Sequence, residues 1–341
     1  MKSEVKRAIW AGVMVAGGLS ILVIIGSRNL QNFDAALVAY TFASIFALFG
    51  ITYRYAIWLQ RPPTSLYWRR GRELFWQKGH RLRNIRFLAG DFFNHFVRQG
   101  FIDKRSHLRW MMHSLIFWGV NLAFAVTFPL VFGWIHFESA GDQMFYRAFV
   151  FGFPTFRFAV DGIVAWLFFH ALDISAVVVI VGVGFAFARR LKDKGAMSVQ
   201  QLANDGVPLI LLFAIAMTGL MLTVSAAYLK GYSFSFIAIS HAVSVILFLL
   251  YLPFGKFFHL FQRPAQMGVA LYKRDGKAGE QARCARCGDE YASAMHVADL
   301  KQVQAALGVD YRLADDGHYQ DICPACRRKS IALSQLRLQG R

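Results

Sequence analysis

Four cysteines near the C-terminal end form two Cys-x-x-Cys pairs. "CARC" contains Cys284 and Cys287, and "CPAC" contains Cys323 and Cys326. Two such pairs supply four thiolates, the tetrahedral set that suits zinc or a single iron, although the gap between the pairs exceeds the usual ribbon spacing of about 15–20 residues. The sequence therefore predicts a metal site in the tail. Zinc as a structural staple is the plainer interpretation, with iron or an iron–sulfur centre as the alternative and a redox-active dithiol as a third.

Four histidines lie in or beside long apolar segments: His113 in "RWMMHSLIFWGV", His170 in "WLFFHALDIS", and His241 and His259 at the two ends of "HAVSVILFLLYLPFGKFFH". Polar groups inside a spanning helix are costly and usually functional, although a lone histidine can simply hydrogen-bond to a neighbouring helix. If His241 to His259 is one continuous helix, five complete turns place both imidazoles on one face, about 27 Å apart. Such a helix could hold two stacked b-type haems, each with a second ligand from another helix.

The positions of flanking arginines predict how the histidines pair. We expect His113 and His259 at the inner level, because each lies four residues from an arginine that borders the apolar run. His170 and His241 are expected together at the outer level, each about five turns from the inner end of its helix. His136, in an outer loop, is an alternative outer ligand. No histidine follows either cysteine pair, so any haem would be non-covalent. We interpret the remaining histidines of the basic inner segment as solvated or interfacial: His80, His95 and His107.

The elements that must position these residues are apolar runs long enough to cross a bilayer. The chain has 341 residues, of which 56% are hydrophobic, a composition typical of a membrane protein. We predict an all-α integral membrane protein with six transmembrane helices and a small cytoplasmic C-terminal module that binds metal through the four cysteines. The first run is interpreted as a retained helix and not a cleaved signal. The runs cover 8–26, 35–58, 110–133, 160–188, 207–227 and 236–258.

The net charge of +18 follows mostly from topology and does not indicate a nucleic-acid partner. Lysine and arginine gather before the first run, in alternate loops and in the tail, while Arg28, Arg147, Arg157 and Lys230 occupy the other loops. By the positive-inside rule both termini are cytoplasmic. We expect a multi-pass protein of the inner, cytoplasmic membrane.

Four regions follow from this organisation: transmembrane helices one and two in 1–58, a basic segment in 59–109, a haem-binding bundle of four helices in 110–262, and the cysteine-containing tail in 263–341. In the basic segment, prolines end the second helix and basic residues alternate with aromatic ones. Such a composition suits an interfacial helix on anionic headgroups. A docking surface for a cytoplasmic partner is the alternative.

The segment "HAVSVILFLLYLPFGKFFHLFQRP" is similar to the last helix of the gamma subunit of respiratory nitrate reductases, a di-haem cytochrome b that oxidises quinol. "RSHLRWMMHSLIFWGV" also resembles the cytochrome b subunits of heterodisulfide-reductase-like and dissimilatory sulfite-reduction complexes. The resemblance covers about 40–260. It implies that His113 and His259 ligate the haem nearer the cytoplasmic partner and that His241 is one ligand of the distal haem.

The sequence departs from the nitrate reductase pattern at one ligand. The family has its second distal histidine ten residues after the position of His113, where this chain has Ala123. The depth of His170 makes it the replacement that we predict, and a protein with a single haem is the main alternative.

These observations predict the electron-transfer and quinone-reactive subunit of an oxidoreductase complex, and not a complete enzyme. It would carry one or two haem b groups and exchange electrons between membrane quinone and a cytoplasmic iron–sulfur or molybdenum subunit. The alternative is a membrane transporter or scaffold whose tail is a zinc-ribbon interaction module. Intramembrane histidines also serve proton relays in transporters, although the chain has no visible inverted repeat.

Overall fold

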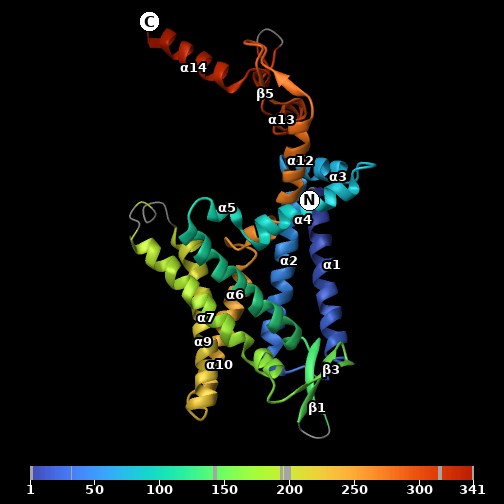
Figure 1. The fold of residues 1–341 in the computed structure, drawn as a ribbon, viewed down its shortest axis with the longest axis vertical. Helices are drawn as coiled ribbons and strands as arrows, with labels where there is room; N and C mark the ends of the chain where they lie inside the picture. The colour runs from blue at the N-terminus through green and yellow to red at the C-terminus, as the bar shows by residue number, and fades with distance from the viewer. Residues whose placement is uncertain are drawn as a thin grey trace. The chain divides into compact units, whose positions relative to one another are not determined.

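The computed structural model describes residues 3–31, 33–140, 144–192, 195, 201–313 and 317–339. The chain is mostly helical, and six of the described helices are long and apolar enough to cross a membrane. A long helix is therefore confirmed at each of the six predicted spans, although the last ends earlier than predicted, and their composition indicates a multi-pass membrane protein. Figure 1 shows them as α1 (Ser3–Gly26), α2 (Val38–Gln60), α6 (His107–Val131), α7 (Ile163–Lys192), α9 (Val207–Tyr228) and α10 (Phe234–Tyr251).

The chain divides into two compact units. The first, which we call the bundle unit, comprises Met1–Ala56 and Arg98–Phe261; the second, the basic unit, comprises Ile57–Val97 and Gln262–Arg341. All six long helices belong wholly or mainly to the bundle unit. The segments expected as a separate basic loop and tail thus contribute to one unit.

Small residues let α6 and α7 pack closely in the bundle unit. A Cβ added at Gly182 would lie 2.8 Å from Ile116 Cγ1, and one at Gly119 would lie 2.7 Å from Val179 Cγ2. Beside them, the Ser175 hydroxyl donates to the Gly119 carbonyl at 2.9 Å. Close backbone approach and a hydroxyl hydrogen bond are typical of helix pairs in membranes, where no hydrophobic force drives helices together.

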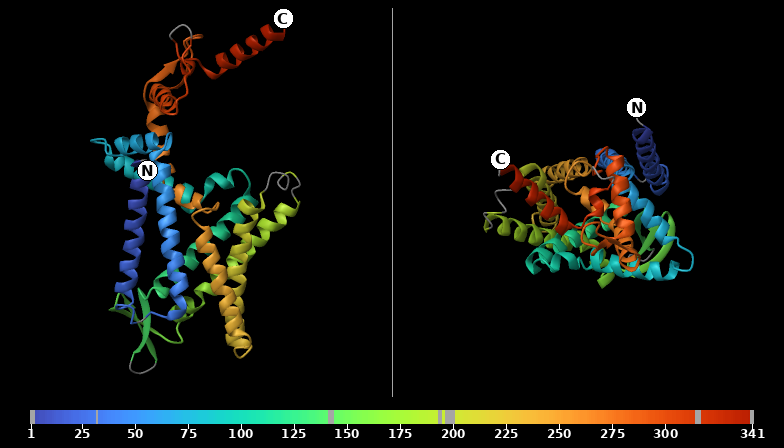
Figure 2. Two further views of the ribbon diagram at one scale, coloured as in Figure 1. Left: turned by 180° about the vertical axis from the view of Figure 1, so that it is seen from behind. Right: turned by 90° about the horizontal axis from the view of Figure 1, so that it is seen from above.

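Helices α9 and α10 form a helical hairpin beside α7. The two helices lie side by side in Figures 1 and 2, joined by a short turn at the end opposite to the start of α9. Gly231, with φ of 79°, lies in that turn, and the Ser225 hydroxyl donates to the Tyr232 carbonyl at 2.7 Å across it. The hairpin thereby places α9 next to the helix that carries His241.

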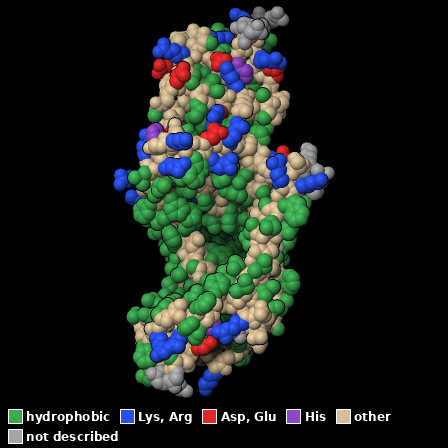
Figure 3. All heavy atoms as spheres, turned by 90° about the vertical axis from the view of Figure 1, so that its right-hand side faces the viewer, with side chains coloured by type: hydrophobic (Ala, Val, Ile, Leu, Met, Phe, Trp, Pro, Cys, Tyr) green, Lys and Arg blue, Asp and Glu red, His purple; other side chains and the backbone are tan. Residues whose placement is uncertain are grey.

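The outward faces of the long helices are apolar. Phe42, Ile163 and Phe236 are 68%, 69% and 74% exposed, respectively. Figure 3 shows a broad band of hydrophobic side chains on the surface with few charged ones among them. Exposed apolar surface of this extent suits contact with lipid.

A three-stranded antiparallel sheet that the sequence did not predict joins α6 to α7. Its strands, in the order β1-β2-β3, are β1 (Ile135–Ala140), β2 (Phe145–Val150) and β3 (Phe153–Ala159). Phe151 and Gly152, with φ of 50° and 80°, form the turn from β2 to β3; two positive φ values suit the twist of a tight hairpin. The aromatic residues of this loop pack on one another, which a search for apolar runs cannot detect.

The predicted helix over 236–258 is broken. α10 ends at Tyr251, and a separate short helix, α11 (Phe258–Gln262), follows. Pro253 lies in the interruption and is fully buried; proline lacks an N–H and its ring clashes with the preceding turn of a helix. Since His241 and His259 do not share a continuous helix, the predicted five-turn register between them is wrong.

Two residues of α2 hold this interruption in place. Arg54 Nη1 donates to the Pro253 carbonyl at 2.6 Å, and its guanidinium lies 4.2 Å from the centre of the Phe258 ring. Gly50 lets α2 approach, because a Cβ there would lie 2.8 Å from the Pro253 ring. The free carbonyl at the end of α10 thus has a charged donor, and Phe258 is buried in the bundle core.

The basic unit is built from short helices and a hairpin: α3 (Thr64–Phe75), α4 (Arg81–Phe92), α12 (Gln266–Ala278), β4 (Gln281–Arg283), β5 (Glu290–Ser293), α13 (Ala294–Ala306) and α14 (Pro324–Gln339). Asp299 on α13 joins three of them. Its carboxylate, 4% exposed, lies 2.8 Å from Arg70 Nη2 and accepts a hydrogen bond from the Tyr272 hydroxyl at 3.0 Å. Burial and the hydrogen bond to Asp299 raise the pKa of Tyr272.

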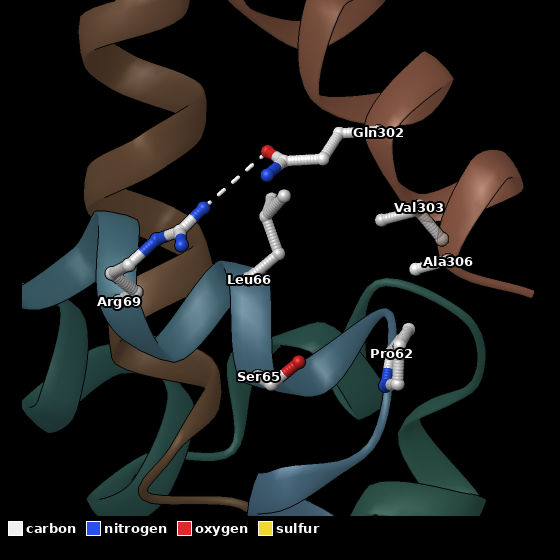
Figure 4. A pocket seen from close by; sticks show the side chains of 7 residues that line it. All are labelled: Pro62, Ser65, Leu66, Arg69, Gln302, Val303 and Ala306. Carbon is white, nitrogen blue, oxygen red and sulfur yellow. Dashed lines mark hydrogen bonds between the residues drawn. The ribbon is translucent and has the colours of Figure 1, made fainter.

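Helices α3 and α13 also face each other across a small cavity of about 140 Å³ (Figure 4). Arg69 donates to Gln302 Oε1 at 3.3 Å at one side of this cavity, and the Leu66 side chain points toward α13. These contacts join residues more than 200 positions apart in the sequence, so the basic loop and the tail fold together.

Candidate functional site

The first cysteine pair lies in the turn between β4 and β5. Cys284 follows β4 directly, and the Gly288 N–H returns to the Cys284 carbonyl at 2.9 Å. Gly288 has φ of +77°, a left-handed conformation that glycine adopts without steric cost. The hairpin therefore brings Cys284 and Cys287 to the same end of the two strands.

The second pair lies at the beginning of α14. Cys323 immediately precedes the helix, Pro324 is its first residue, where proline is favoured, and Cys326 lies in the first turn. The Cys326 N–H donates to Cys323 Sγ at 3.4 Å. A helix start thus presents two thiols in the same direction.

All four cysteine sulfurs lie within 4.8 Å of one another. Cys287 Sγ and Cys323 Sγ are 3.7 Å apart, close to the edge of about 3.8 Å that a tetrahedron of sulfurs has when each metal–sulfur bond is about 2.3 Å. All four cysteines are free thiols. The predicted cluster is confirmed as a group of residues that could bind one metal ion.

Backbone N–H groups stabilise the thiolate form of Cys284, whereas hydrogen bonding to the neighbouring thiols raises the pKa of Cys287 and Cys326. Cys284 Sγ accepts from the Cys323 N–H at 3.2 Å and from the Arg286 N–H at 3.4 Å. These bonds, the one from Cys323 first, lower the pKa of Cys284 to about 6. A metal ligand must be a thiolate, so Cys284 is prepared for binding near neutral pH.

His170 and His241 occupy equivalent positions on their helices. Each lies seven residues after the first residue of its helix, Ile163 in α7 and Phe234 in α10, which corresponds to about 10 Å along the axis. In a chain that crosses the membrane six times, α7 and α10 begin on the same side. Two histidines that bind one haem must lie at the same depth, and the positions of His170 and His241 meet this requirement.

The hydrogen bonds of His170 and His241 fix the protonated ring nitrogen. His170 Nδ1 lies 2.9 Å from the Trp166 carbonyl, which can only accept. His241 Nδ1 lies 2.9 Å from Thr218 Oγ1, and Thr218 uses its own proton to donate to the Ala214 carbonyl at 2.6 Å. A neutral ring that donates through Nδ1 has its lone pair on Nε2.

His113 and His259, which the sequence predicts as the inner pair, have the same arrangement. His113 Nδ1 lies 2.7 Å from Gln99 Oε1, and His259 Nδ1 lies 2.5 Å from the Lys256 carbonyl. His113 is the seventh residue of α6, whereas His259 lies in α11, beyond the end of α10. The pairing of His113 with His259, like that of His170 with His241, stays a prediction.

Sequence reasoning missed Gln99 and Thr218, the side chains that hold His113 and His241. Gln99 is only 2% exposed, and its Nε2 has no hydrogen-bond partner among the described residues. No motif marks either residue, because each meets its histidine only through helix packing or a turn. Gly219, next to Thr218, also lies beside the His241 ring, where a Cβ would make an ordinary van der Waals contact with Cε1 at 3.5 Å.

Three further histidines have acidic neighbours, whereas His80 Nδ1 lies 2.7 Å from Arg83 Nη2. His107 and His95 lie 3.0 Å from the carboxylates of residues four positions earlier, Asp103 and Asp91. His136, on β1, stacks on Phe149 and lies 3.3 Å from a Glu138 carboxylate oxygen. These positions lie outside the six long helices, except that His107 is the first residue of α6.

Searches against family models, curated proteins and solved structures found no match to this chain.

Proposed function

We propose that the chain is the cytochrome b subunit of a respiratory oxidoreductase in the cytoplasmic membrane, with both termini in the cytoplasm. It would pass electrons between quinone or quinol and a cytoplasmic iron–sulfur or molybdenum subunit. The observation that carries the proposal is the shared state of four histidines on or next to the long helices: each donates through Nδ1 to an acceptor. Nε2 is thereby the ligand atom in every case.

This arrangement is what a haem ligand requires. Histidines that bind metals almost always donate their other N–H to an acceptor, which fixes the ring and raises its basicity. His170 and His241 would hold the outer haem, and His113 and His259 the inner one. When bound, each haem would supply a one-electron carrier in the membrane.

The break after α10 changes how the inner site is formed. His259 does not lie on the helix that carries His241. Its position depends instead on α11, whose Phe258 is buried in the bundle core. The contact of Arg54 with Pro253 and Phe258 places that short helix. We therefore infer that Arg54 positions His259 indirectly.

In this proposal the four cysteines hold a structural zinc ion. Three of the residues that pack around them come from separate parts of the tail: Ile322, Tyr291 and Leu313. A metal ion would therefore hold together segments that bury few other apolar side chains. Iron at the same site would carry an electron from the inner haem toward a cytoplasmic partner. Metal analysis of the purified chain distinguishes the two.

A reduced-minus-oxidised absorption spectrum of the purified protein tests the proposal. We expect b-type bands with dithionite, and the same bands in part after addition of a reduced benzoquinol or naphthoquinol. Dithionite bands without any response to quinols would contradict the role in quinone chemistry. A spectrum without haem bands would favour the transporter or scaffold with a zinc-binding tail.

A further inference from the structure

A groove of about 690 Å³ runs between α4 and α12 in the basic unit. One wall is formed by the end of α4 and the π-helical turn η2 (Phe93–Val97), and the other by α12 and the residues just before it. A volume of this size accommodates an organic molecule and not merely an ion. Neither the cysteine cluster nor the histidine sites proposed for haem contribute to it.

One part of the groove is apolar and aromatic. Phe87, Phe92 and Phe96 line it from α4 and η2, with the rings of Phe92 and Phe96 stacked 4.9 Å apart. Met267 and Ala270 line the opposite wall, three residues apart on one face of α12. These side chains would suit a hydrocarbon chain better than a polar solute.

The other part of the groove is strongly basic. The next turns of the same α12 face present Lys273, Arg274 and Lys277. Arg274 is engaged with Asn84 and Asp275, at 2.7 Å and 2.6 Å. Within the described residues no carboxylate lies in ion-pair distance of Lys273 or Lys277, so these two ammonium groups are available to an anion.

One carboxylate also lines the groove. Asp91, at the end of α4, lies 3.0 Å from His95 Nδ1. A protonated His95 can therefore form an ion pair with the Asp91 carboxylate. One carboxylate against four basic side chains, Arg263, Lys273, Arg274 and Lys277, leaves the groove positive, which favours an anionic ligand.

Both walls are connected by short segments to the same ends of long helices. η2 ends ten residues before the first residue of α6, and α12 begins fifteen residues after the last residue of α10. With six crossings, the start of α6 and the end of α10 lie on the same side of the membrane. Short connections therefore join both walls of the groove to helix ends on one side of the membrane.

We propose that this groove binds one anionic phospholipid. Lys273 and Lys277 would contact the headgroup phosphate, and an acyl chain would lie along Phe87, Phe92 and Phe96. Clustered basic residues next to a spanning helix are typical of sites for anionic lipids, and the apolar wall adds the surface that a soluble phosphate would not need. The proposal depends on neither haem nor the cysteine metal.

Native mass spectrometry of the full-length protein, released from detergent with added lipid, tests this site. We expect a single phosphatidylglycerol to bind the unaltered chain in preference to phosphatidylcholine. The double variant Lys273→Gln/Lys277→Gln should weaken that binding about tenfold, because each basic residue near an anionic headgroup contributes substantially. The matched control is Arg328→Gln/Lys329→Gln, which removes the same charge from two exposed residues of α14.

A third variant and a competitor separate lipid from phosphate. Phe92→Ala should weaken phosphatidylglycerol binding while leaving the two lysines in place, and glycerol 3-phosphate should compete poorly. Equal binding of both lipids, equal loss in the α14 control, or full competition by glycerol 3-phosphate would each overturn the proposal.

Discussion

The cysteine cluster and the histidine positions are both candidate metal sites, yet they differ in how the chain forms them. The four sulfurs converge within 4.8 Å, because a hairpin turn and the first turn of a helix each hold one pair rigidly. The histidines are placed by four helices and fixed by single hydrogen bonds to four different acceptors. The first site is closed by local geometry; the second depends on the packing of long helices.

This difference determines what each site should do when a ligand is removed. A module whose core consists of the ligands themselves should lose its fold with the metal. A bundle with an extended apolar core should keep its fold when one histidine is replaced, because its helices pack through many other residues. The following predictions test that contrast.

The largest effect is expected from Cys323→Ser. The loss of one thiolate from a four-thiolate site should abolish stoichiometric metal binding and expose the tail, since structural sites of this kind contribute about 10 kcal/mol or more to folding. Metal content by mass spectrometry and the rate of limited proteolysis of the tail measure this. Arg286→Gln is the control, because Arg286 contacts Cys284 through its backbone N–H, which the change leaves in place. A stable, metal-loaded Cys323→Ser protein would contradict a structural role for the metal ion.

Replacement of His170 by alanine should remove one of two haems and leave the helices folded. The physical reason is that His170 would supply one of two axial ligands to the outer haem only. Haem per chain and the helical circular dichroism signal are the measurements, with His107→Ala as control because that side chain is 75% exposed. Two haems in His170→Ala, and one in His136→Ala, would assign the ligand to β1.

An intermediate effect is expected in the basic unit from Asp299→Asn. The change removes the charge that Arg70 and Tyr272 share at Asp299, while Arg70 keeps its ion pair with Glu73 at 3.2 Å. Because Arg70 is also 34% exposed, we expect a loss of about 2 kcal/mol, below that of a fully buried pair. Proteolysis between α12 and α13 should then accelerate roughly thirtyfold. Glu290→Gln, in an exposed pair with Arg283, should change little, and equal effects of both would contradict a special role for Asp299.

The smallest effect is expected from Thr218→Val. This change removes the acceptor for His241 Nδ1 while keeping the shape of the side chain, and such partners typically contribute about tenfold or somewhat more to metal affinity. Haem dissociation and the midpoint potential of the outer haem measure it. Thr223→Val on the same helix, whose hydroxyl donates to Asp173, is the control; unchanged haem properties in Thr218→Val would argue against His241 as a ligand.

The parts of the structure that could be predicted from the sequence are those with a local signal. Long apolar runs predicted the six spanning helices, and the Cys-x-x-Cys spacing predicted the cluster, because both depend on neighbouring residues. The sheet of β1 to β3 escaped prediction since its strands are short and rich in aromatic residues. Pro253 was visible in the sequence. The break that divides the predicted helix into α10 and α11 could not be predicted, because it depends on the contacts of Pro253 with α2.

The side chains that orient the histidines could not be predicted for a similar reason. Thr218 precedes His241 by 23 residues and reaches it across a helix pair. Gln99 approaches His113 from a segment outside the long helices. Only helix packing brings these groups together, and no spacing rule encodes it.

Haem content per chain, determined as the pyridine haemochrome of the purified full-length protein, tests the central claim most directly. We predict two b-type haems per chain, one for each pair of histidines. A protein that is folded, carries metal at its cysteines and contains no haem would contradict the proposed function.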